Sequence, residues 1–168
     1  KLPALGLFAP KGFASALDNP EPLPLKQMTE KALELLSPAE KGFVVMIEGS
    51  QIDWCGHAND IACAMAEMHD FAEAIKVAKA YVDSHPDTIL VVTADHETGG
   101  LSLGAKGNYS WKRDVIKKVK HSGDYIAGQL LALKDEKVFY QAWLGLTALE
   151  LSAEEQQLLT KARTEGLK

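Results

Sequence analysis

Long apolar runs are missing from this sequence. No hydrophobic stretch approaches the roughly 20 residues that a bilayer-spanning helix needs, so we expect no membrane span. Residues 1–10 combine a basic start with a short apolar stretch broken by Pro3 and Pro10, which is not the pattern of a signal peptide. There is no initiator methionine either. We therefore expect a chain that was processed or excised from a longer one.

Cysteine is also scarce, with Cys55 and Cys63 as the two examples. If one continuous helix contained both, their Cα atoms would lie about 12 Å apart. That separation is beyond the reach of a disulfide. On this basis the cysteines do not indicate a redox compartment.

The length and composition are those of an ordinary globular domain. The 168 residues suffice for one compact domain and are few for two. Hydrophobic residues make up 46% and charged residues 24%, close to the averages for soluble domains. The net charge of -5 argues against a nucleic-acid partner and against an anionic membrane.

The hydrophobic pattern predicts an α/β fold. Two apolar runs of strand length, residues 43–47 and 89–94, flank a segment at 61–82 whose apolar residues recur at helical spacing. A strand, a long helix and a second strand are typical of a right-handed crossover between parallel strands. A further amphipathic helix is predicted over residues 25–36. We therefore expect a core built on a parallel sheet.

The pattern changes after Gly99 and Gly100, and becomes helical from Trp111 onward. We predict helices at 114–121 and 124–133, and a last helix that begins at the capping box formed by Ser152 and Glu155. The resulting division is an α/β portion at residues 1–110 and a helical appendage of the same domain at 111–168.

Two polar clusters directly follow the two predicted strands. Glu48, Asp53 and His57 come after the first, and Asp95 and His96 after the second. In parallel α/β sheets, ligands bind beyond the carboxyl ends of the strands, so both clusters are expected at one edge. Carboxylates and imidazoles bind zinc, and carboxylates bind magnesium. The sequence therefore predicts a divalent-metal site.

In this order and spacing the two clusters resemble the metal-binding core of the alkaline phosphatase family. The resemblance runs from about residue 42 to residue 104, and residues 5–9 are compatible with the region upstream of it. It implies that Glu48 binds magnesium, that Asp53 and His57 bind a first zinc ion, and that Asp95 and His96 bind a second. It further implies a phosphate monoester substrate, a phosphoserine intermediate, a homodimeric parent enzyme, and a periplasmic or secreted location.

The sequence also departs from the family pattern. The serine nucleophile, a bridging aspartate and a phosphate-binding arginine of the family belong to segments upstream of any present here. A further zinc-ligand histidine is expected downstream in a Gly-His-Thr setting, but the last histidine, His121, lies in a lysine-rich segment. We therefore expect weak metal sites and no complete catalytic cycle from this chain alone.

Several alternatives stay open at this stage. The parent could be another hydrolase of the superfamily, namely a phosphodiesterase, a sulfatase or a mutase, or the chain could be a non-catalytic metal-binding fragment. Asp53 could instead cap a helix. Thr98 could be a hydrogen-bond partner of a ligand or a local cap. Cys55 lies between ligand positions, where a thiolate could bind metal.

Overall fold

The structure, a computed structural model, describes residues 3–19 and 23–165. These residues form two compact units, one ending at Ser102 and the other beginning at Leu103. No helix in the described ranges combines the length and apolar character needed to cross a membrane. The first unit contains α1 (Leu25–Leu36), α2 (Gln51–His57) and α3 (Ile61–Ser84). The second contains the short 3-10 helix η1 (Ala105–Gly107), α4 (Arg113–Ile116), α5 (Gly123–Leu131), α6 (Glu136–Thr147) and α7 (Ala153–Glu165).

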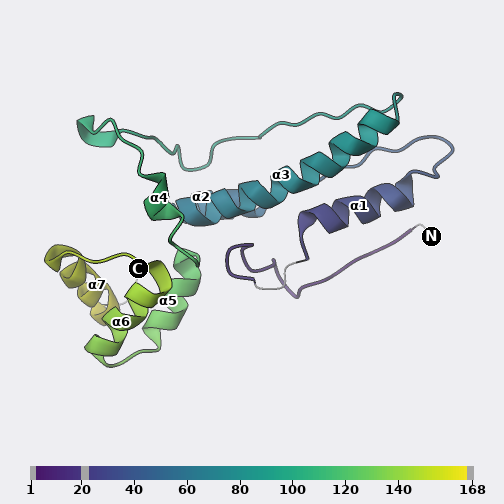
Figure 1. The fold of residues 1–168 in the computed structure, drawn as a ribbon. Helices are drawn as coiled ribbons and strands as arrows, with labels where there is room; N and C mark the ends of the chain where they lie inside the picture. Colours follow the sequence, from purple (N-terminus) through teal and green to yellow (C-terminus); the bar gives the residue numbers. More distant parts are fainter. Residues whose placement is uncertain (1–2, 20–22, 166–168) are drawn as a thin grey trace. The chain divides into compact units, whose positions relative to one another are not determined.

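The predicted parallel sheet is wrong. Within residues 3–19 and 23–165 there is no β-strand, and both apolar runs, 43–47 and 89–94, are drawn as irregular chain in Figure 1. A strand is stabilised by backbone hydrogen bonds to a neighbouring strand, which an apolar run cannot supply by itself. Val44 and Ile89 are accordingly 97% and 86% exposed. The described fold is helical, with the predicted helices at 25–36 and 61–82 present as α1 and α3.

Helix α3 is the base on which α1 and α2 pack. Its buried positions are mostly small, which lets neighbouring helices approach closely; they are Ala62, Cys63, Glu67, Ala74 and Ala78. On α1 the buried residues are Thr29 and Leu33. Met65 and Met68, two of the apolar residues whose helical spacing predicted α3, are 40% and 53% exposed. The helix is therefore correct, but its buried face is the one lined by alanine.

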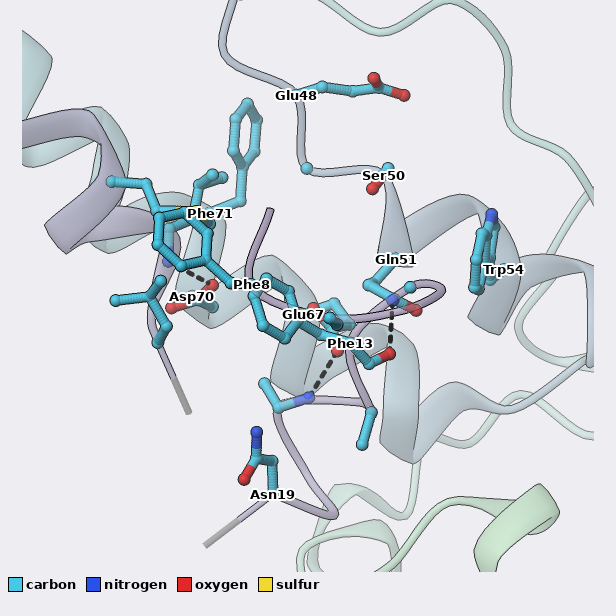
Figure 2. Close-up of a pocket in the computed structure, with 18 of the residues that line it drawn as sticks. Phe8, Phe13, Asn19, Glu48, Ser50, Gln51, Trp54, Glu67, Asp70 and Phe71 are labelled. Carbon is cyan, nitrogen blue, oxygen red and sulfur yellow. Dashed lines mark hydrogen bonds between the residues drawn. The ribbon is translucent and has the colours of Figure 1, made fainter. Parts of the chain in front are cut away.

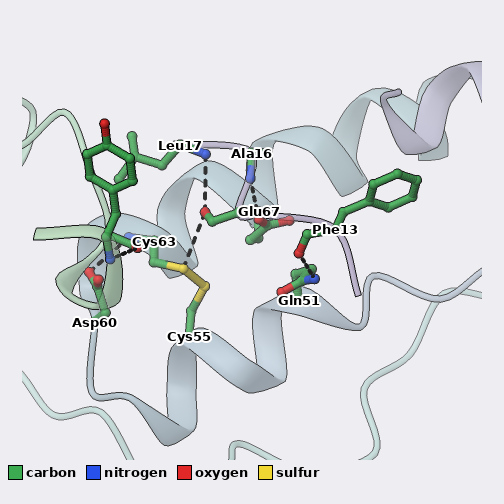
Figure 3. Close-up of a disulfide and its surroundings, with 11 residues drawn as sticks. Phe13, Ala16, Leu17, Gln51, Cys55, Asp60, Cys63 and Glu67 are labelled. Atoms are coloured by element: carbon green, nitrogen blue, oxygen red, sulfur yellow. Dashed lines mark hydrogen bonds between the residues drawn. A yellow bond between two sulfur atoms is a disulfide. The ribbon is translucent and has the colours of Figure 1, made fainter. Parts of the chain in front are cut away.

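The two cysteines form a disulfide, with their Cα atoms 5.5 Å apart. They lie on different helices, since α2 ends at His57 and α3 begins at Ile61. The chain reverses between them at Asn59, whose φ of 52° is left-handed. One continuous helix through both cysteines would have kept them beyond disulfide reach, but this turn interrupts the helix and brings them together. Figure 3 shows the cross-link joining the two helices.

The segment before α1 is fastened to α2 and α3 by hydrogen bonds. The backbone N–H of Ala16 donates to the Glu67 carboxylate at 2.6 Å. At the junction with α1, the N–H of Leu25, the first residue of that helix, donates to the Asp70 carboxylate at 3.1 Å. The Gln51 side chain donates to the Phe13 carbonyl at 2.8 Å. A cavity of about 320 Å³ lies between this segment and the helices (Figure 2). These contacts give the buried Glu67 a partner and hold α2 from its N-terminal end.

The second unit is a small helical bundle. Its core consists of the buried Ile126, Leu130 and Phe139, around which other apolar residues of the unit pack. The indole N–H of Trp143 donates to the Leu149 carbonyl at 2.9 Å, which ties α6 to the chain that follows it. The predicted helix at 124–133 is present as α5, whereas the one predicted at 114–121 is reduced to α4.

The capping box predicted at the start of α7 is confirmed. Ser152 accepts from the Glu155 N–H at 3.3 Å, and Glu155 accepts from the Ser152 N–H at 2.7 Å. This second hydrogen bond lowers the pKa of the Glu155 carboxyl. Its contribution to stability is therefore present above the ordinary carboxyl pKa, and is lost as the pH falls through the lowered value.

We expect Ser152→Ala to destabilise α7 by about 1 kcal/mol, because it removes a side-chain acceptor for an N–H of the first turn. Amide hydrogen exchange in the first turn of α7 should become faster. Glu154→Ala is the control, because the described structure shows no hydrogen bond from that exposed side chain. Equal exchange in Ser152→Ala and the unsubstituted chain would contradict the prediction.

Candidate metal centre

Helix α2 presents two of the predicted metal ligands on one side. Asp53 and His57 are four residues apart, which places them on the same helical face. The Oδ2 atom of Asp53 lies 3.6 Å from Nε2 of His57, and their side chains are 39% and 71% exposed. Solvent therefore reaches both groups.

The segment after residue 94 brings the second predicted pair to the same place. His96 Nε2 lies 3.8 Å from Oδ1 of Asp53 and 3.6 Å from Oδ2 of Asp95. Asp53 thus has an imidazole near each of its carboxylate oxygens. The structure brings together four of the five predicted ligands, although they come from segments about 40 residues apart in sequence.

Thr98 joins the two segments. Its hydroxyl donates to Oδ1 of Asp53 at 2.7 Å, and its backbone N–H donates to Nδ1 of His96 at 3.0 Å. The φ of Thr98 is 61°, a left-handed value that is unfavourable for a β-branched residue and is held here by these contacts. Thr98 is therefore a hydrogen-bond partner of the predicted ligands, as the sequence suggested among its alternatives.

The close approach of the two segments depends on glycine. A Cβ atom on Gly56 would lie 3.1 Å from Cβ of Thr98, and one on Gly99 would lie 3.1 Å from the Gly56 carbonyl oxygen. Both separations are too short for a relaxed contact. Sequence reasoning did not single out Gly56. Its position next to a predicted ligand, in Cys55-Gly56-His57, was the available signal.

The ionisation of Asp95 suits a metal ligand. The backbone N–H of His96 donates to Oδ1 of Asp95 at 3.0 Å. This hydrogen bond is the main cause that lowers the pKa of the Asp95 carboxyl, and the nearby His96 imidazole lowers it further. The side chain is 89% exposed. The lowered pKa favours its deprotonated carboxylate, which is the form that binds cations.

The separation between each carboxylate oxygen and its neighbouring imidazole nitrogen suits two ligands of one zinc ion. Zinc held at about 2.0–2.1 Å by tetrahedral ligands requires donor atoms roughly 3.4 Å apart. The three N···O separations, 3.6, 3.8 and 3.6 Å, are close to that value. In the described ranges, however, no three such side chains converge on one point. Each pair would leave coordination positions open to water.

Glu48, the predicted magnesium ligand, is not joined to this group. It precedes α2, and in the described structure it makes neither a hydrogen bond nor an ion pair. Figure 2 shows its carboxylate pointing away from the rings of Phe8 and Phe71. Its role as a ligand stays a prediction.

Comparison with known proteins decides the family. The sequence profile of alkaline phosphatase matches residues 1–161. The chain belongs to the alkaline phosphatase family. It is 40% identical over 159 residues to alkaline phosphatase 3 of Bacillus subtilis, a match that covers 94% of this chain and 34% of that protein. It is 36% identical over 143 residues to an alkaline phosphatase of Schizosaccharomyces pombe, covering 78% of this chain and 27% of that protein.

A solved alkaline phosphatase structure has the same chain path. The crystal structure of a cold-active alkaline phosphatase from a psychrophilic Shewanella species matches with a TM-score of 0.88 and 46% identity. The match covers 96% of this chain and 40% of that one. The chain thus spans between a quarter and two fifths of the alkaline phosphatases that it matches.

Proposed function

We propose that this chain is the metal-binding part of a phosphomonoesterase that works through a phosphoserine intermediate, with the nucleophile contributed by residues outside this sequence. The observation that carries the proposal is the position of Asp53 between the imidazoles of His57 and His96, at separations of 3.6 and 3.8 Å. In a member of the alkaline phosphatase family, this grouping supports a zinc-dependent phosphatase over a purely structural cluster of polar residues.

Each neighbouring carboxylate and imidazole of the proposed centre is assigned to one zinc ion. Asp53 and His57 would hold one zinc ion, Asp95 and His96 a second, and Glu48 a magnesium ion. Bound zinc ions supply positive charge to the entering and leaving oxygens of phosphoryl transfer. Within the chain, Thr98 keeps the Asp53 carboxylate oriented through its hydroxyl, and the His96 N–H keeps Asp95 ionised. Two protein ligands for each zinc ion predict weak binding, because three or four are usual.

The remaining features of the parent enzyme are proposals as well. Its substrate would be a phosphate monoester, and it would form a homodimer and act in the periplasm or outside the cell. The Cys55–Cys63 disulfide supports export, because disulfides persist in oxidising compartments and are rare in the cytosol. The net charge of -5 leads us to expect neither a nucleic-acid nor a membrane partner.

The test pairs p-nitrophenyl phosphate hydrolysis at alkaline pH, with zinc and magnesium added, with a zinc titration of the same sample. We expect weak zinc binding and no turnover, because the nucleophile is absent from this chain. The chain alone should therefore show no phosphatase activity. Substitution of the corresponding ligands in the parent enzyme should abolish the activity of that enzyme.

Two other results would revise the proposal. Turnover that is abolished by a chelator and by Asp95→Ala would show that a nucleophile lies within these 168 residues. Absence of zinc binding at any accessible concentration would contradict the proposed metal centre. Lys79→Ala serves as the control, because Lys79 pairs with Asp83 on the exposed surface of α3 and contacts no predicted ligand.

A further inference from the structure

Helix α2 is short for an element that carries two metal ligands. It has seven residues, fewer than an isolated helix needs to be stable in water. Its order must therefore come from what it is attached to. Asp53 and His57 are on the exposed side, whereas Cys55, two residues from each, is 1% exposed. Residues two apart on a helix point in different directions, so the cysteine faces the protein while the ligands face solvent.

The attachment of α2 at its C-terminal end centres on the disulfide. Cys63 lies in the first turn of α3, a helix of 24 residues, and is 6% exposed. The Asp60 N–H donates to the Cys55 carbonyl at 2.9 Å, and the Asp60 side chain accepts from the Cys63 N–H at 3.0 Å. Sγ of Cys63 also lies 3.5 Å from the Ser15 hydroxyl (Figure 3). The disulfide is thus the covalent bond, besides the backbone, that joins α2 to α3. Its α2 residue, Cys55, lies between the predicted ligands Asp53 and His57 in the sequence.

We infer that the Cys55–Cys63 disulfide is a positioning element of the metal centre, which fixes α2 so that Asp53 and His57 stay aligned with His96. The inference rests on the proposed metal-binding function. Without the cross-link, α2 is held by hydrogen bonds and by its packing against α3 but by no covalent bond to it beyond the backbone. Asp53 and His57 then sample more orientations, and zinc binding must order them. The affinity for zinc is then lower, although neither cysteine touches the ion.

Opening the cross-link requires an external reductant. Cleavage of the sulfur–sulfur bond takes up two electrons and two protons and gives two thiols. A water-soluble phosphine supplies the electrons and becomes a phosphine oxide, with water providing the oxygen and both protons. Both cysteines are buried, so the reductant reaches them only when the turn opens locally. The cross-link therefore persists in the folded chain under mildly reducing conditions.

The experiment compares zinc affinity in the oxidised 168-residue chain and in Cys55→Ala/Cys63→Ala, by competition with a chromogenic chelator. Loss of groups that orient metal ligands typically weakens metal binding by about 10- to 100-fold. We expect about a 10-fold weaker zinc affinity in the double variant. Cobalt(II) titrated in place of zinc gives a second readout, because its visible absorption reports the ligand geometry.

Two controls separate positioning from general destabilisation. Leu33→Ala removes a buried side chain of α1 and destabilises the same unit, yet it should leave zinc affinity unchanged. In an Asp53→Ala/His57→Ala background, removal of the disulfide should have no further effect on zinc binding, because both groups that it positions are gone. Loss of zinc affinity in Leu33→Ala equal to that in the double cysteine variant would contradict the inference.

The outcomes also distinguish this inference from the proposed function. Equal zinc affinity with and without the disulfide overturns the inference and leaves the metal centre intact. Absence of zinc binding in every form overturns the metal centre, and the inference with it. If the double variant fails to fold, the chain reduced by the phosphine and then alkylated with iodoacetamide replaces it, because alkylated thiols cannot bind zinc. Equal or tighter zinc binding by that alkylated chain contradicts the inference.

Discussion

Replacement of Asp53 by alanine should weaken zinc binding more than any other single substitution in the candidate centre. Its two carboxylate oxygens lie 3.6 and 3.8 Å from the imidazoles of His57 and His96. One change therefore removes a proposed ligand of the first zinc ion and the carboxylate that faces His96. Removal of an outer partner costs about 10- to 100-fold in metal affinity, and loss of a direct ligand should cost at least about 100-fold. Isothermal titration with zinc measures the effect.

A matched control for this experiment is Asp83→Ala. Asp83 is also an exposed aspartate of the first unit, and it pairs with Lys79 at the far end of α3 rather than with an imidazole. Its removal should leave zinc affinity unchanged. Asp53→Asn adds a second comparison, since the amide keeps an oxygen that accepts from the Thr98 hydroxyl but loses the charge. Equal zinc affinity in Asp53→Ala and Asp83→Ala would contradict the assignment.

Replacement of Phe139 by alanine should have the largest effect on stability. The ring is 4% exposed, packs with Ile126 and Leu130, and is covered by the Arg163 guanidinium, 5.3 Å from the ring centroid. Truncation of a buried phenylalanine costs about 3–5 kcal/mol. A small domain is stable by only about 5–15 kcal/mol, so the second unit should lose much of its stability.

Chemical denaturation followed by far-ultraviolet circular dichroism measures this effect. Val138→Ala is the control, because Val138 is adjacent in sequence but 46% exposed. A surface substitution of this kind should change stability by no more than about 0.5 kcal/mol. Coincident unfolding curves for Phe139→Ala and Val138→Ala would contradict the packing described here.

The helices of this chain follow from sequence more closely than the rest of the fold. Apolar residues at helical spacing predicted α1 and α3, and a capping box predicted the start of α7. The prediction of two strands was wrong because residues 43–47 and 89–94 have the composition of strands but no neighbouring strand among the described residues. Helical hydrogen bonds lie within one segment, whereas those of a strand depend on a second one. Periodicity alone cannot reveal that second segment.

The candidate centre shows a similar division. The residue types and spacing of Asp53, His57, Asp95 and His96 indicated metal chemistry, which stays a prediction, and the structure brings the four side chains together. The contacts that bring the two segments side by side involve Gly56, Thr98 and Gly99, whose importance depends on separations of about 3 Å that no spacing encodes. The disulfide was missed for the same reason. A turn at Asn59 shortened a distance that had been calculated along a straight helix.

The exposure of the two apolar runs has a practical consequence for handling the chain. Val44, Met46, Ile89 and Val91 are each more than three quarters exposed, on backbone that is not paired within the described residues. Runs of this composition with free backbone groups are templates for intermolecular β-sheet aggregation. Concentrated solutions of the chain should therefore become turbid before dilute ones. Val44→Lys and Val91→Lys, at exposed positions that are not themselves predicted ligands, are the most direct way to keep it in solution.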